Sequence, residues 1–119
     1  MVFIEDTDLR TVIRDEFLEL VTDIASEDEA LETDDVQDKA EASAISKMKS
    51  YLSKRYDVAK VFDPAEEYSD KELIKEYCVD MMLHRLHARI NPRNIPAIRK
   101  ERYAEAMDWL EGVAMGDIN

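Results

Sequence analysis

The residue types best suited to chemistry stand close together near position 80. Asp80, His84 and His87 follow one another at spacings of four and three, which on a helix brings their side chains within roughly 60° of one another. Two imidazoles and a carboxylate can bind zinc or iron. A two-helix carboxylate site also needs matching ligands on partner helices, however, and the sequence contains no Glu-x-x-His motif. We therefore expect no metal and no other cofactor, but an ion pair of Asp80 with a histidine or simply solvated histidines.

The other candidate side chains suit packing better than catalysis. Cys78 would need an electropositive, accessible pocket to act as a nucleophile, yet it shares a helical arc with Ile74 and Met81, which indicates a core position. Tyr103 and Trp109 stand on one predicted helix, where aromatic residues usually anchor a core or an interface. The sequence has neither a glycine-rich phosphate loop nor a Gly-x-Ser-x-Gly motif. We expect no catalytic residues and no enzyme activity.

Chain length and charge narrow the class of protein. With 119 residues the chain suits one core, and we predict one helical domain over residues 1–119. Its 16 Lys and Arg against 28 Asp and Glu give a net charge of −12, which repels phosphate and argues against nucleic-acid capture as the main activity. A single cysteine excludes an internal disulfide. Charge-free runs of about five residues are far shorter than the roughly 20 that a membrane span requires, so no membrane partner is expected.

Hydrophobic spacing predicts an all-α fold, a bundle of about four helices. Strands have little support in the sequence, and at most Phe3 and Ile4 could pair briefly in an edge strand. The first helix, capped by Thr7 or Asp8, carries a stripe of apolar residues at helical spacing, namely Leu9, Ile13, Phe17, Leu20 and Ile24. A break in this helix near Arg14 is one option.

Three further helices are predicted beyond an exposed loop over residues 26–35, where like acidic charges disfavour tight packing. A structured connector over residues 57–68 separates the second helix from the third. Ser69 and Glu72 form a capping box at the start of the third helix, and Gly116 can take the left-handed conformation that ends the fourth. The expected ranges of these helices are 36–56, 69–90 and 96–116.

The third helix has two apolar seams on nearly opposite sides. One seam holds Leu73, Ile74, Tyr77, Cys78 and Met81, and the other holds Val79, Met82, Leu83, Leu86 and Ile90. A surface helix in a monomer needs one stripe. Either this helix is therefore central to the bundle, or its second seam contacts another chain.

The charge of the chain is polarised along the sequence. Residues 1–38 contain 14 acids and two bases, whereas the remaining residues hold 14 of each. A basic stretch over residues 85–102 includes Arg85, Arg89, Arg93, Arg99, Lys100 and Arg102. Intrachain pairing or a solvated acidic surface would explain this pattern. Packing of the acidic end of one subunit against the basic end of the next would explain it as well.

Three strings in register resemble a known family. YLSKRY at 51–56 preceded by Ala40-x-x-x-Ala44, YCVDMMLHRL at 77–86, and RKERYAEAMDWL at 99–110 followed by Gly116 are similar to the Mu-like phage and prophage head–tail connector family. This is a group of small virion proteins long described as a domain of unknown function. The similarity spans residues 36–116, a connector-like core, and leaves out the acidic N-terminal part, residues 1–38.

The resemblance implies a helical adaptor that forms a ring between portal and tail and lets DNA pass without binding it specifically. Its partners would be further copies of itself, the portal protein and tail proteins, at the head–tail junction of the virion after assembly in the bacterial cytoplasm. On this interpretation the neighbour-contacting residues are Val79, Met82, Leu83, Leu86, Ile90, Arg85, Arg89, Arg93, Arg99 and Arg102. The channel-facing acids are Glu27, Asp28, Glu29, Glu32, Asp34, Asp35 and Asp38.

Two other classes of function remain open from the sequence. An acidic regulatory module that mimics DNA would need carboxylates spaced like phosphates on a folded face. A metal-dependent helical-bundle enzyme would need a bound metal.

Overall fold

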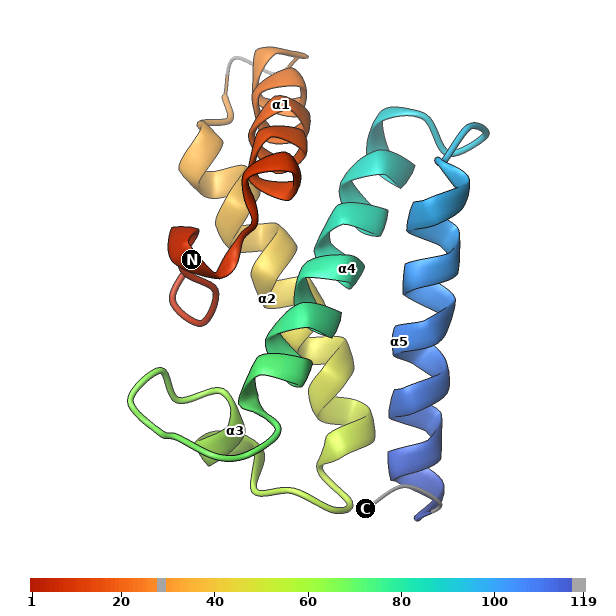
Figure 1. Ribbon diagram of the computed structural model, residues 1–119. Helices are drawn as coiled ribbons and strands as arrows, with labels where there is room; N and C mark the ends of the chain where they lie inside the picture. The colour runs from red at the N-terminus through yellow and green to blue at the C-terminus, as the bar shows by residue number, and fades with distance from the viewer. Residues whose placement is uncertain (28–29, 117–119) are drawn as a thin grey trace.

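Four long helices and two short helical segments follow one another in the part of the chain that the structure describes (Figure 1). The computed structural model describes residues 1–27 and 30–116. In order, its elements are a 3-10 turn η1 (Asp6–Asp8), α1 (Thr11–Glu27), α2 (Thr33–Leu52), α3 (Val58–Val61), α4 (Lys71–Ile90) and α5 (Ala97–Met115). This confirms the all-α bundle, its four main helices and the structured connector between the second and the third.

Helix α4 is the central element. It packs against α1, α2 and α5, and in Figure 1 it stands between α5 and the α1–α2 pair. Both of its apolar seams are therefore inside the protein, where each buried aliphatic side chain contributes about 1.5–3 kcal/mol. In the second seam Val79, Met82, Leu83 and Leu86 are buried, and Ile90 at the helix end is 36% exposed. The prediction that this seam contacts a neighbouring subunit is thus wrong for the four buried residues, because they already contact this chain's own helices.

The N-terminal segment is held by a side chain instead of a strand. Among the described residues no strand forms, as the all-α prediction requires, and Phe3 and Ile4 do not pair in an edge strand. Both side chains are buried, and their backbone amides donate to the carboxylate of Glu41 on α2. The first helix begins at Thr11, later than predicted, and runs without a break at Arg14.

The acidic connection between α1 and α2 is shorter than predicted. Helix α1 continues to Glu27, and α2 already begins at Thr33. The backbone N–H of Glu32 donates to the carboxylate of Asp35 at 3.4 Å, and acids in the first turn of α2 favour the positive end of the helix dipole. The predicted loop over residues 26–35 was therefore too long at both ends. At its C-terminal end the reason is that acids that repel one another in a loop stabilise a helix start.

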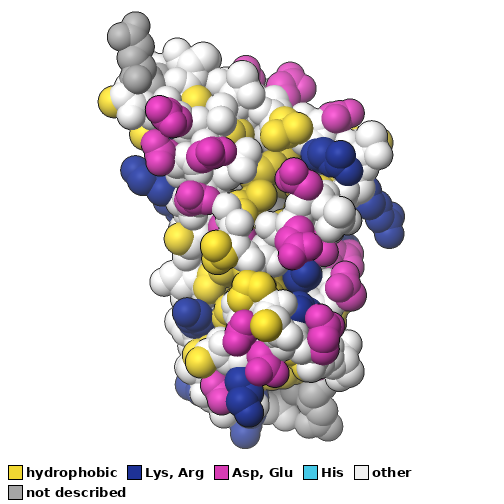
Figure 2. Space-filling model, turned by 90° about the vertical axis from the view of Figure 1, so that its left-hand side faces the viewer, with side chains coloured by type: hydrophobic (Ala, Val, Ile, Leu, Met, Phe, Trp, Pro, Cys, Tyr) yellow, Lys and Arg dark blue, Asp and Glu magenta, His cyan; other side chains and the backbone are white. Residues whose placement is uncertain are grey.

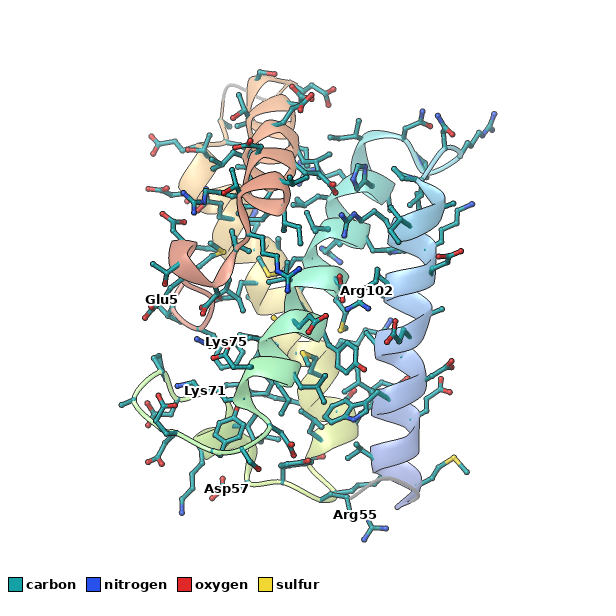
Figure 3. The ribbon with its side chains drawn as sticks, viewed as in Figure 1. Glu5, Arg55, Asp57, Lys71, Lys75 and Arg102 are labelled. Carbon is teal, nitrogen blue, oxygen red and sulfur yellow. The ribbon has the colours of Figure 1, made fainter. Side chains whose placement is uncertain are left out.

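The connector around α3 is fixed by polar contacts to its backbone. The hydroxyl of Tyr68 donates to the carbonyl of Val61 at 2.6 Å, and Nζ of Lys71 donates to the carbonyls of Pro64 and Glu66 at 3.1 and 2.6 Å. Figure 3 shows Lys71 beside this loop. Helix α4 begins at Lys71, with Asp70 at the N-cap, so the predicted cap at Ser69 lies one residue too early.

The fourth long helix follows its prediction closely. Pro96 is the N-cap of α5, and Gly116 ends the helix at φ = 81°, in the left-handed region that favours glycine. Trp109 packs on Tyr77 of α4 with ring centroids 5.4 Å apart. These aromatic residues therefore anchor α5 to α4 within the chain.

Candidate functional site

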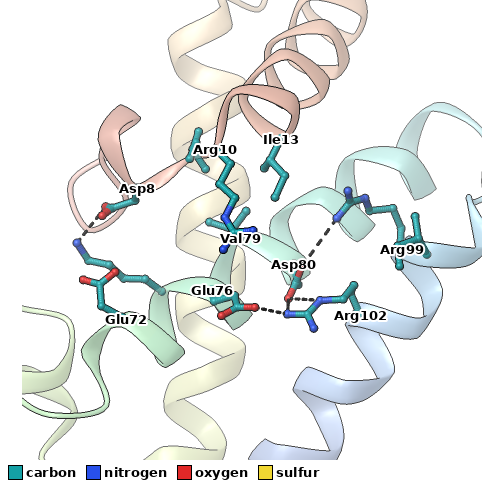
Figure 4. A pocket seen from close by; sticks show the side chains of 12 residues that line it. Asp8, Arg10, Ile13, Glu72, Glu76, Val79, Asp80, Arg99 and Arg102 are labelled. Atoms are coloured by element: carbon teal, nitrogen blue, oxygen red, sulfur yellow. Dashed lines mark hydrogen bonds and ion pairs between the residues drawn. The ribbon is translucent and has the colours of Figure 1, made fainter.

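A charged groove opens where the start of α1 meets α4 and α5 (Figure 4). Its volume is about 540 Å³. Four apolar residues line it, namely Leu9, Ile13, Val79 and Ile98. Its charged lining consists of Asp8, Arg10, Glu72, Lys75, Glu76, Asp80, Arg99 and Arg102.

Asp80 is the buried centre of the ion pairs in this groove. It is 4% exposed, and its Oδ2 accepts hydrogen bonds from Nη2 and Nε of Arg102 at 2.8 and 3.1 Å. Nη1 of Arg99 lies 3.8 Å from Asp80 Oδ1. Burial raises the pKa of Asp80, and Arg102 opposes that rise through its hydrogen bond and charge. The carboxylate is thus a paired buried charge that joins α4 to α5.

The ion pairs continue from Asp80 to α1. Arg99 reaches Glu16 through Nη2, 3.1 Å from Oε1, and its Nε lies 2.8 Å from Oε2 without a linear hydrogen bond. Nε2 of His87 also lies 3.0 Å from Glu16 Oε2. On the outer side, Arg102 pairs with Glu76 at 2.6 Å. The ion pairs of this groove therefore join α1, α4 and α5 to one another.

The three candidate metal ligands point to separate partners. Asp80 pairs with arginines, His87 with Glu16, and the ring of His84 stacks on Tyr103 with centroids 4.0 Å apart. The expected ion pair between Asp80 and a histidine is wrong, because arginines from α5 reach the carboxylate instead. The alternative of simply solvated histidines is not met either, because His84 and His87 are half-buried against Tyr103 and Glu16. Across the described ranges, no group of three His, Cys, Asp or Glu side chains is placed to hold a metal ion.

Cys78 lies in the core, as predicted. Its side chain is 0% exposed, and burial raises the pKa of its thiol well above the usual value. The thiolate needed for nucleophilic chemistry is therefore strongly disfavoured.

The predicted basic surface divides into two parts. Arg99 and Arg102 pair with carboxylates of their own chain, and not with a neighbouring subunit as predicted. Arg85, Arg89 and Arg93 are exposed and have no acidic partner within residues 1–27 and 30–116. Arg89 and Arg93 thus give the turn between α4 and α5 a cationic surface that no described carboxylate neutralises, and Arg85 lies further back on α4.

The described members of the predicted channel-facing acids lie between the last residue of α1 and the second turn of α2. Glu27, Glu32, Asp34 and Asp35 are exposed, and Asp38 is exposed and pairs with the amino group of Met1. Asp28 and Glu29 lie outside the described residues. In Figure 1 the connection between α1 and α2 and the turn between α4 and α5 both lie toward the upper end of the molecule. Figure 2 shows the face that carries the N-terminal segment and the connector, with acidic side chains spread over its height and basic ones among them.

Three buried charged residues escaped the sequence analysis. Glu41 is 4% exposed, Lys71 5% and Lys75 9%. Lys75 pairs with Asp8 at 2.9 Å, and its Nζ lies 5.7 Å from the ring centroid of Phe3. The sequence signal for such residues is a charged side chain at an inward position of an otherwise apolar stripe. This signal does not predict which backbone groups or charged side chains will pair with it.

Comparison with known protein families identifies the family of this chain. The sequence matches the family described as Bacteriophage Mu, Gp36, over residues 3–119. The chain belongs to this family. The Gp36 match includes the acidic N-terminal part, which the resemblance in residues 36–116 did not cover. No curated protein and no solved structure gave a significant match. Within the part of the chain that the structure describes, no helix is long and apolar enough to cross a membrane.

Proposed function

We propose that this Gp36-family protein is a non-enzymatic structural component of the virion, a head–tail connector that forms a ring between portal and tail. DNA passes through the ring without specific binding. Membership of a bacteriophage Mu family supports the phage context. The observation that carries the finer proposal is the placement of two exposed charged surfaces toward one end of the molecule, acidic on the α1–α2 side and basic on the α4–α5 side. Apart from Asp38, which pairs with Met1, their charged side chains have no ion-pair partner among residues 1–27 and 30–116.

The subunit contact in this ring is formed by the turn between α4 and α5. With Val79, Met82, Leu83 and Leu86 buried, the exposed residues of the predicted interface are Arg85, Arg89, Ile90 and Arg93, and the last three lie at this turn. Unpaired arginines beside an exposed apolar side chain suit a heterologous contact with an acidic surface. The contact would be electrostatically steered and therefore sensitive to salt.

The acids of the α1–α2 end face the channel or its mouth. Like charge in a channel wall keeps the duplex from adhering, because binding would require release of condensed counterions by cationic groups. The protein should then show no micromolar affinity for duplex DNA at physiological salt. A micromolar dissociation constant in a fluorescence-anisotropy titration would contradict this part of the proposal.

A complementation experiment tests the connector role. A phage lacking this gene should produce filled heads and free tails that do not join, and the wild-type gene supplied in trans should restore tailed particles. The double variant Arg89→Glu and Arg93→Glu should fold normally by circular dichroism yet fail to restore them. Lys54→Glu is the matched control, since Lys54 is exposed on the connector side, and it should complement. Normal tailed virions without the gene would refute the proposal.

A further inference from the structure

A second, smaller hollow lies between α2, α4 and α5, separate from the charged groove. Its volume is about 220 Å³, and its polar lining comes from Ser43, Lys47, His84, Arg85 and Tyr103. Every ionisable side chain in this lining other than the tyrosine is basic, and no carboxylate of the described residues lines it. Such a lining is unexpected in a chain whose net charge is −12.

The basic groups of this hollow are positioned by neutral contacts. Nζ of Lys47 donates to the hydroxyl of Tyr103 at 2.6 Å, and the Tyr103 ring stacks on His84 at an interplanar angle of 16°. Arg85 is exposed and has no ion-pair partner in the described part of the chain. Three cationic or potentially cationic side chains therefore converge from α2 and α4 while α5 supplies the aromatic support.

The environment of His84 reflects this excess of positive charge. Burial lowers the pKa of His84, and the charges of Lys47 on α2, His87 on α4 and Lys100 on α5 lower it further. His87 is itself paired with Glu16 of α1, whereas Lys47 has the Tyr103 hydroxyl as its hydrogen-bond acceptor. An anion in the hollow would relieve this repulsion and favour the imidazolium.

We propose that this hollow binds inorganic phosphate. Lys47, Arg85 and protonated His84 would donate to its oxygens, with the Ser43 hydroxyl as a neutral donor. Several positively charged hydrogen-bond donors around a small volume suit a phosphate dianion, which has three or four acceptor oxygens, better than a carboxylate, which has two. Duplex DNA is disfavoured as the source of the phosphate, because the acid-rich remainder of the chain repels a polyanion.

Nuclear magnetic resonance of the full chain tests this site directly. Titration with inorganic phosphate at constant ionic strength should shift the His84 ring signals saturably and raise the pKa of His84. Arg85→Gln and Lys47→Gln should each weaken phosphate binding at least about tenfold, as expected for loss of one charge-assisted hydrogen bond. Lys54→Gln removes one positive charge at an exposed site elsewhere and should leave the affinity unchanged.

The same titration with other anions separates the alternatives. Acetate and a short DNA duplex, at matched ionic strength, should produce no saturable shift of His84. The proposal is overturned if phosphate gives no saturable response, if acetate binds as tightly as phosphate, or if Lys54→Gln weakens binding as much as Arg85→Gln. Circular dichroism of each variant distinguishes loss of the site from loss of the fold. The result is independent of whether the protein forms a ring.

Discussion

Replacing Glu41 by alanine is expected to release the N-terminal segment from the bundle. The Glu41 carboxylate is buried, and it accepts the backbone N–H groups of Val2, Phe3 and Ile4 at 3.0, 3.1 and 2.8 Å. The amides of Phe3 and Ile4 make buried hydrogen bonds, and an unsatisfied buried donor costs about 1–3 kcal/mol. Removing the carboxylate also removes the cost of burying its charge, which offsets part of this loss. We therefore expect the free energy of unfolding to fall by about 3 kcal/mol.

Urea unfolding followed by circular dichroism measures this loss, and hydrogen exchange at Phe3 and Ile4 locates it. Asp38→Ala is the matched control, because Asp38 also binds the N-terminal segment, through the Met1 amino group, but at an exposed site. A surface pair of this kind is worth about 0–1 kcal/mol. If Glu41→Ala and Asp38→Ala destabilise the protein equally, or if the Phe3 and Ile4 amides stay protected in Glu41→Ala, the argument from buried amides is refuted.

Three further predictions concern single side chains. Gly116→Ala should lower the free energy of unfolding by about 1–2 kcal/mol, because the left-handed conformation strains alanine. The added Cβ would also meet Arg55 Nη2 at 2.4 Å. Urea unfolding measures the loss, and an unchanged midpoint would contradict the prediction. Burial raises the pKa of Tyr68 to about 12, from 10.0, so its stabilising contribution is complete below pH 10 and is lost as the pH rises toward 12. Tyr68→Phe should therefore lose less stability than the wild type over that interval, and equal losses would count against this assignment. Cys78 should react with an aromatic disulfide reagent only on unfolding, and rapid reaction of the native protein would show that the thiol is accessible.

The helices with strong apolar periodicity were predictable because burial on one side imposes that periodicity. Helix α4 shows both the strength and the limit of this argument. Its two seams were visible in the sequence, but whether Leu86 packs against this chain or another depends on how α1 and α2 surround it, which no single helix specifies. The structure resolves that choice in favour of a central helix.

The polar interior was much less predictable. Asp80 was singled out for its histidine neighbours on the same helix, yet its partners, Arg99 and Arg102, come from α5. Glu41 offered no motif at all, since its partners are backbone amides about 38 residues away. Periodicity identifies which positions face inward, whereas the partner of a buried charge is set by tertiary packing.

Electron microscopy of purified virions labelled with an antibody to this chain tests the central claim most directly. The account predicts label at the junction of head and tail, in several copies per particle. Absence of the protein from virions, or label confined to the capsid shell or the tail tip, would contradict the account.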